Sequence, residues 1–291
     1  MAATSRGSQP VDRAITATGD PDRASVQASE ARRVWERRAT ECHDDLRSVL
    51  FKGLPEVLNQ EIHHRHVAAV LEGLAGLPEN AVVLDVGCGY GRVSAALRRM
   101  RPGWHLVGAD MARPFVERYQ QYVGGSPTSG VCAQLPWLPF AESTFDAAVV
   151  VTCLMYFESP GWVTALRAIL QTVKPTGSLV IIEPGWQGEF IYTVGGILPR
   201  ILGRRAGGPS PTGGRAFSLS EFAAGVRHAG GRLRQIWGMP VLTCLLTPLA
   251  GIAQVSPRTA RRVCAASRAV DRIAQTRGAG SVYVAASVSP T

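Results

Sequence analysis

Long apolar segments are missing from this 291-residue chain. It has no uncharged, proline-free apolar run of about eighteen residues, which disfavours a membrane-spanning helix. Residues 1–28 also lack the apolar segment of a secretory signal and are rich in Ala, Ser, Thr, Asp and Gly. We therefore predict a disordered tail over 1–28 and a cytoplasmic protein.

Metal-binding patterns are missing as well. The six cysteines form no CxxC pair, and no histidine cluster lies beside them at ligand spacing. The sequence therefore predicts no metal site, and reduced thiols rather than disulfides.

Lysine is scarce, and acidic residues are scarce in the last third. Only Lys52 and Lys174 are present, and residues 186–291 hold 13 Arg against Glu189, Glu221 and Asp271. This excess fits an anionic acceptor, a membrane surface or nucleic acid, and equally a solvated arginine surface. RNA-stacking surfaces interleave aromatic residues with basic ones, and that pattern is missing here, which disfavours nucleic acid.

The spacing of apolar residues along the chain predicts two helices followed by an α/β domain. Apolar residues recur at helical spacing over 29–50 and 56–75. Short apolar runs then alternate with helical segments, as in βαβ units with a parallel sheet. The predicted strands are 81–86, 104–109, 131–133, 145–151 and 178–183, and the predicted helices between them are 92–99, 114–122 and 162–173.

The last third is less regular. Residues 186–216 contain many Gly and Pro and are predicted as loop with one short helix near 197–202. A helix over 220–229, capped by Ser218 or Ser220, precedes two strands at 232–237 and 281–286. Between these strands, residues 235–256 carry no charge, and 258–277 form a basic, Ala-rich helix.

One glycine loop carries the strongest functional signal. Residues 84–91, Leu-Asp-Val-Gly-Cys-Gly-Tyr-Gly, lead from a strand through glycines into a helix. Asp110 ends the next strand, where an acid can accept hydrogen bonds from ribose hydroxyls. A dinucleotide site is the rival, but its G-x-G-x-x-G fingerprint needs glycine at 92, where this chain has Arg92.

Together with three further segments, this loop resembles the class I S-adenosyl-L-methionine (SAM)-dependent methyltransferases, of the small-molecule "type 11" subgroup. Residues 83–94 resemble motif I, 138–146 resemble its LPF…FD stretch, 154–157 fall where Leu-His-His is common, and 170–180 match its "hLKPGGxLh" turn. The resemblance implies a Rossmann-like, seven-stranded, mostly parallel sheet. It further implies an N-terminal helical cap over 29–78 and a SAM-binding domain over 79–291, in which 186–216 and 238–280 are acceptor-side lids or insertions.

The resemblance also implies roles for single residues on the methionine and ribose side of the cofactor. Asp85 is expected near the methionine amino group, through water. Gly87, Cys88 and Gly89 are expected to contact the methionine part through their backbone. Asp110 is expected to hold the ribose.

The remaining cofactor contacts follow in the same way. Met111 is expected against the adenine, with Gln134 and Leu135 at its edge. Gln134 stands where the family often has an acid, and its amide oxygen can accept the same bond. Val151 and Thr152 are expected to face the sulfonium.

A general base is optional for methyl transfer, and several residues are candidates. Tyr156 ranks first, because it follows the fourth predicted strand at the mouth of the site. His63 and His66 lie beside the apolar stripe of their helix, where a core-edge role competes with catalysis. Glu183 and Tyr192 are further candidates. Trp35 is a candidate to pack over the cofactor or, alternatively, in the core.

The long insertion between the last two strands predicts a property of the acceptor. A helical lid there, apolar inside and basic outside, indicates a largely apolar acceptor and, as a corollary, peripheral contact with anionic membranes. A segment that merely completes the core is the alternative. We expect methyl transfer to a small metabolite or natural product. Lipid-like or quinone-like acceptors at a membrane, and a non-catalytic SAM- or RNA-binding protein, remain the alternatives.

Overall fold

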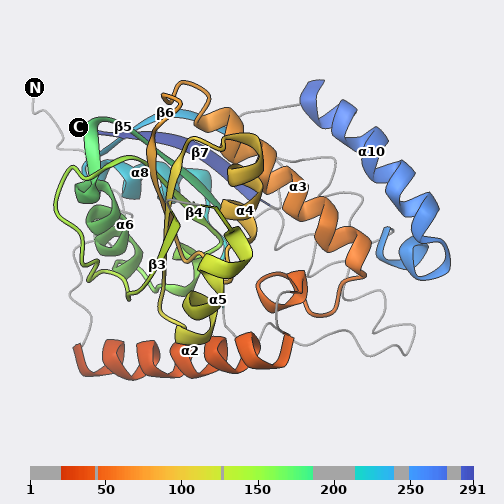
Figure 1. Ribbon diagram of the computed structural model, residues 1–291, viewed down its shortest axis with the longest axis horizontal. Coiled ribbons are helices and arrows are strands. Elements are labelled where there is room, and N and C mark those ends of the chain that lie inside the picture. The colour runs from red at the N-terminus through yellow and green to blue at the C-terminus, as the bar shows by residue number, and fades with distance from the viewer. Residues whose placement is uncertain (1–20, 43–44, 126–127, 186–213, 239–248, 274–282) are drawn as a thin grey trace, which may run out of the picture.

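The computed structural model describes residues 21–42, 45–125, 128–185, 214–238, 249–273 and 283–291 (Figure 1). Most of the tail predicted over 1–28 and most of the loop predicted over 186–216, with its short helix, lie outside the described residues.

A seven-stranded sheet forms the centre of the molecule, in the order β3-β2-β1-β4-β5-β7-β6. Strands β1 to β5 are parallel, and β7 is antiparallel to both β5 and β6. This confirms the predicted Rossmann-like, mostly parallel sheet. The strands are β1 (Val82–Val86), β2 (His105–Asp110), β3 (Thr128–Cys132), β4 (Phe145–Val151), β5 (Val173–Pro184), β6 (Gly231–Gly238) and β7 (Tyr283–Pro290).

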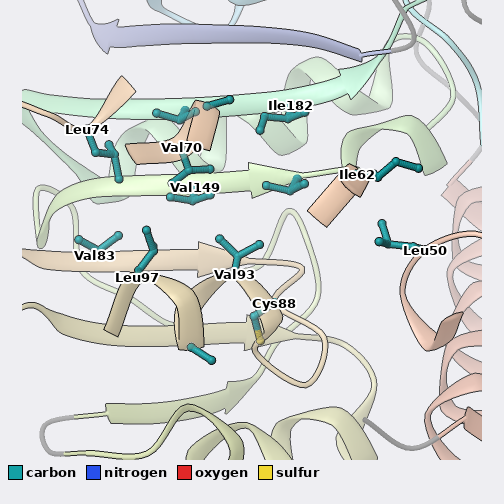
Figure 2. Packing of buried hydrophobic residues seen from close by; sticks show 14 of the residues in the cluster. Leu50, Ile62, Val70, Leu74, Val83, Cys88, Val93, Leu97, Val149 and Ile182 are labelled. Atoms are coloured by element: carbon teal, nitrogen blue, oxygen red, sulfur yellow. The ribbon is translucent and has the colours of Figure 1, made fainter. Parts of the chain in front are cut away.

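Helices cover both faces of the sheet, because successive strand residues point to opposite sides. Val83 packs in one buried cluster with α3 (Glu56–Gly73), α4 (Arg92–Met100) and α5 (Arg113–Val123). Its neighbour Leu84 packs in the other, with α6 (Gly161–Thr172) and α8 (Leu219–His228). Figure 2 shows part of the first cluster, where Val70 of α3 lies close to Val149 of β4.

Further helical elements lie around this sandwich. The N-terminal helix α2 (Pro21–Cys42) and the 3₁₀ turn η1 (Leu46–Ser48) precede α3, and the 3₁₀ turn η2 (Leu154–Tyr156) follows β4. Helix α10 (Pro257–Ile273) packs against the outside of α3 (Figure 1). Ala260 and Cys264 of α10 are buried in the same cluster as α3.

Local signals explain several helix starts. The Ser218 hydroxyl accepts a hydrogen bond from the backbone N–H of Glu221 at 3.2 Å, which settles the N-cap of α8 on Ser218. The Ser256 hydroxyl accepts one from the N–H of Thr259 at 3.3 Å. Pro257 then occupies the first position of α10, where its missing N–H costs nothing.

Four predicted boundaries need correction. Helix α2 begins at Pro21, so 21–28 are not tail, because proline suits the first turn of a helix. It ends at Cys42, and η1 replaces the end of the helix predicted over 29–50. Strand β3 begins at Thr128 rather than 131, because Thr128, Ser129 and Gly130 already pair with β2. Strand β5 begins at Val173, across the predicted turn, because Val173 pairs with Phe145.

Candidate cofactor site

A cleft of about 870 Å³, counting the part open to solvent, lies at the carboxyl ends of β1, β2 and β4. In parallel α/β sheets, ligands bind at this edge, where the strand order reverses. Here the order reverses between β1 and β4. The cleft lining is mostly apolar, with Asp85, Asp110 and Arg92 as its charged residues.

The predicted glycine loop forms the floor of this cleft. Gly87 and Gly89 have φ angles of 67° and 53°, which favour glycine. A Cβ on Gly87 would lie 2.8 Å from the Cys153 sulfur, and one on Gly89 would lie 2.8 Å from a Val49 methyl carbon. Only a bare backbone therefore fits, and the loop presents main chain rather than side chains to a ligand.

Asp110 ties this loop to the second strand. Its Oδ2 accepts a hydrogen bond from the N–H of Gly89 at 2.9 Å, and its Oδ1 accepts one from the N–H of Ala112 at 2.8 Å. Burial raises the pKa of the Asp110 carboxyl, and these backbone bonds oppose that rise. Each carboxylate oxygen keeps lone-pair capacity for a ligand hydroxyl.

Asp85 is the second acid in the cleft. Its Oδ2 accepts a hydrogen bond from the hydroxyl of Ser94 at 2.6 Å, and Ser94 in turn accepts one from Tyr119 at 2.8 Å. Burial raises the pKa of Asp85 to about 6, although the Ser94 bond and Arg92 act in the opposite direction. At neutral pH the group is mainly ionised and can face a cationic ligand group.

Arg92 explains the position of the two predicted histidines. Its guanidinium lies 3.2 Å from the Nδ1 atoms of both His63 and His66. Burial and Arg92 lower the pKa of His63 to about 3 and that of His66 well below its usual value. Both rings are therefore neutral.

Neither His63 nor His66 lines the cleft. Both contact the guanidinium of Arg92, which does line the cleft, and their role as bases stays a prediction.

Tyr156, the first-ranked candidate, does line the cleft. The ring of Trp35, from α2, meets it edge-on, with centroids 5.3 Å apart and an interplanar angle of 75°. Trp35 therefore lies at the cleft, rather than in the core alone. The guanidinium of Arg38 lies over the Trp35 ring, 4.9 Å from its centroid.

Glu183 holds the turn that carries Tyr156. Its carboxyl oxygens accept hydrogen bonds from the N–H groups of Cys153, Leu154 and Met155, at 3.0, 2.7 and 3.2 Å. Burial raises the pKa of Glu183 to about 8, against the effect of these bonds. Glu183 does not line the cleft, so it is a positioning residue. Tyr192 lies outside the described residues.

Most of the other predicted cofactor contacts also lie at the cleft. Its lining includes Cys88, Met111, Leu135, Val151 and Thr152. Thr152 has a φ of 53°, unusual for a β-branched residue, and strain of this kind concentrates at functional sites.

Gln134 is the exception among these contacts. It is absent from the lining, and its Oε1 accepts a hydrogen bond from Arg32 of α2 at 2.8 Å. That oxygen keeps a second lone pair, and its predicted contact with adenine stays a prediction.

The predicted cap and the predicted lid differ in position. Trp35 and Val49, from the segment predicted as a cap over 29–78, line the cleft, whereas α3 belongs to the layer on the sheet. None of the described residues 249–273 lines the cleft. That part of the predicted lid packs on α3 and completes the core, and residues 239–248 lie outside the description.

Several cleft residues escaped the sequence argument. They are Val49, Phe115, Leu138 and Phe157. The apolar position of Phe115 in α5 predicts burial but not which cavity it faces. Val49, which follows η1, lies in the segment predicted as a helix over 29–50, so its spacing likewise predicts burial alone. Leu138, in the loop after β3, carries no periodic signal.

Comparisons with known proteins fit this geometry. Residues 83–177 match a family described as "Methyltransferase domain". The chain is 30% identical over 151 residues to the demethylmenaquinone methyltransferase of Lactiplantibacillus plantarum, covering 45% of this chain and 61% of that protein. It is 30% identical over 124 residues to the sterol 4-C-methyltransferase of Caenorhabditis elegans, covering 41% and 35%. The chain thus spans less than two thirds of either relative.

Solved structures share the fold. The [4+2]-cyclase SpnF has a TM-score of 0.50 and 22% identity, with 78% of this chain and 80% of that chain covered. Because this neighbour is described as a cyclase, the fold alone does not specify the reaction.

Proposed function

We propose that this chain, which carries a class I SAM-dependent methyltransferase domain, transfers a methyl group from SAM to a small, largely apolar acceptor. The observation that carries the proposal is a cleft lined by a glycine loop, two acids and several aromatic residues. We assign the loop and the acids to a cofactor end, and Trp35, Tyr156 and Phe157 to an acceptor end.

The loop end fits the cofactor. Gly87 and Gly89 leave room for a ligand against the main chain, and a Cβ at either position would meet a neighbour at 2.8 Å. Asp110 would hold the ribose hydroxyls, with Met111 and Leu135 against the adenine. Asp85 would face the amino group of the methionine part, with Cys88 beside it.

The other end fits an apolar acceptor. Trp35, Leu138, Tyr156 and Phe157 line it, and among these side chains only the Tyr156 hydroxyl and the Trp35 indole N–H can form hydrogen bonds. Such a surface favours a ring or an alkyl chain with one polar group.

When bound, SAM supplies a methyl group on a sulfonium, so the reaction is an in-line displacement. The chain's part is to align the acceptor and exclude water, and alignment of this kind can contribute about 7–11 kcal/mol. Trp35 and Phe157 exclude water from the acceptor end. The Tyr156 hydroxyl orients the acceptor's polar group and is the candidate to take its proton.

Lipid-like or quinone-like acceptors are the second candidate. The names of the two relatives include a sterol and a menaquinone precursor, both largely apolar. An acceptor of this kind fits the same aromatic end of the cleft.

The test is transfer of labelled methyl from SAM to a panel containing a naphthoquinol, a sterol, a phenol and a primary amine. We expect label on one of the apolar acceptors. Label on the amine alone would contradict the apolar acceptor. SAM binding without transfer to any acceptor, including a cell extract, would favour the non-catalytic alternative.

Matched glycine variants control this assay. Gly89→Val should abolish SAM binding and transfer, because a Cβ there meets Val49. Gly53→Val should change neither, because a Cβ there has no neighbour within 4 Å. Thermal unfolding of both variants separates loss of the site from loss of the fold.

A further inference from the structure

Within the described residues 249–273, the outward side of α10 carries basic side chains and no exposed acid. Arg258, Arg261 and Arg262 are all exposed. The only acid between residues 249 and 271 is Asp271, which is buried. Within this described segment, the outward side therefore presents positive charge alone.

A buried ionic cluster explains why the acid is turned inward. Arg65 of α3 pairs with Glu61 at 2.8 Å and with Asp271, and it donates to the Ser267 hydroxyl at 2.8 Å. Arg268 pairs with the other oxygen of Glu61. The cluster holds two arginines and two acids, so its charges balance. Within residues 249–273 no further acid is left to neutralise the three arginines on the outward side.

Apolar side chains accompany these arginines. Val255 is 89% exposed, Val270 50% and Ile252 37%. Scattered exposed apolar residues are ordinary, but here they flank a cluster of arginines along one short segment.

We propose that this surface binds the headgroup region of an anionic lipid bilayer. We call it the α10 face and define it by Ile252, Val255, Arg258, Arg261, Arg262 and Val270. Basic side chains next to exposed apolar ones are the pattern of helices that lie in a membrane interface. Figure 1 shows α10 at the margin of the molecule, with α3 between it and the sheet.

The composition of the α10 face favours a bilayer over RNA. Residues 249–271 contain no aromatic residue, and single-stranded nucleic acids are bound by aromatic stacking platforms. Contact is peripheral, since within the described part of the chain no helix is long and apolar enough to cross a membrane. The α10 face is separate from the cleft, so this binding does not rest on the proposed transfer reaction.

The experiment is co-sedimentation of the whole chain, without SAM, with phosphatidylcholine vesicles and with vesicles that also contain phosphatidylglycerol. We expect binding to the anionic vesicles alone, weakening as salt is raised. The variant R258E/R261E/R262E should bind on the order of a hundredfold more weakly, since each basic residue near such a surface contributes about 1 kcal/mol. Val255→Ser should weaken binding about tenfold and keep the salt dependence.

The control is R227E/R232E/R234E, which changes the net charge equally at exposed arginines of α8 and β6. It should bind like the unaltered chain. Equal losses in both triple variants would overturn the proposal, because net charge alone would then explain binding. No binding to anionic vesicles, or tighter binding to single-stranded RNA that R258E/R261E/R262E also abolishes, would overturn it as well. Thermal unfolding confirms that each variant is folded.

Discussion

The ring of Trp35 lies edge-on to the ring of Tyr156, with centroids 5.3 Å apart, and both rings line the same cleft. Trp35 belongs to α2, and Tyr156 to the turn after β4. The N-terminal helix therefore contributes directly to the acceptor end of the proposed site.

Trp35→Ala should raise the KM for the acceptor about three- to tenfold, because an aromatic pair contributes about 0.5–1.5 kcal/mol beyond its buried area. Trp35→Phe should recover part of the loss. Steady-state kinetics and SAM calorimetry measure the two effects separately. The control is Trp137→Ala, since Trp137 is 74% exposed and absent from the lining. A larger loss in SAM affinity than in acceptor KM would move Trp35 to the cofactor end.

Asp110→Ala should weaken SAM binding roughly tenfold or more, because it removes a charged acceptor worth about 1.5–3 kcal/mol. It also removes the bonds from Gly89 and Ala112 that hold the loop. Calorimetry measures the affinity, with Glu117→Ala, an exposed acid of α5, as the control. Unchanged affinity in a folded Asp110→Ala protein would refute the assignment.

Acid should destabilise the folded chain through His63. Burial and Arg92 lower its folded pKa to about 3, from an ordinary value of 6.5. A lowered folded pKa stabilises the native state above pH 6.5, and this contribution is lost as pH falls from 6.5 toward 3.

His63→Gln should therefore lose less stability over that range than the unaltered chain, since glutamine does not titrate. Urea unfolding at several pH values measures it. His105→Gln, at an exposed histidine, is the control. If the unfolding free energy of all three proteins falls equally as pH is lowered, protonation of His63 is not coupled to folding.

Removing Arg65 should cost about 3–5 kcal/mol of unfolding free energy, because Glu61 and Asp271 would stay buried without their partner. The double variant R65M/D271L should recover much of this loss, since it also removes one of the stranded charges. Lys52→Ala, which breaks an exposed pair with Glu41, should change little. Urea unfolding measures these changes in unfolding free energy. An equal loss in the single and double variants would show that lost packing, rather than a buried unpaired charge, causes the destabilisation.

The amino-acid sequence alone was enough to predict the central sheet and its glycine loop. Alternating apolar runs and helical segments predict the parallel sheet, and the loop from Asp85 to Gly91 is a local feature. The position of Asp110 beside this loop can also be predicted, because neighbouring parallel strands end at one edge of the sheet. These predictions depend on short-range periodicity and on glycine's conformational freedom.

Tertiary packing decided the surroundings of that centre. His63 and His66 have helical spacing in the sequence, yet only the packing of α3 on the sheet brings them both against Arg92. The insertion's apolar residues predict burial, but a hydrophobic surface is non-directional and does not name its partner. For α10 the partner is α3, and the buried ion pair between Arg65 and Asp271 joins the two helices. Buried charges require matched geometry, which the spacing of residues in the sequence does not encode.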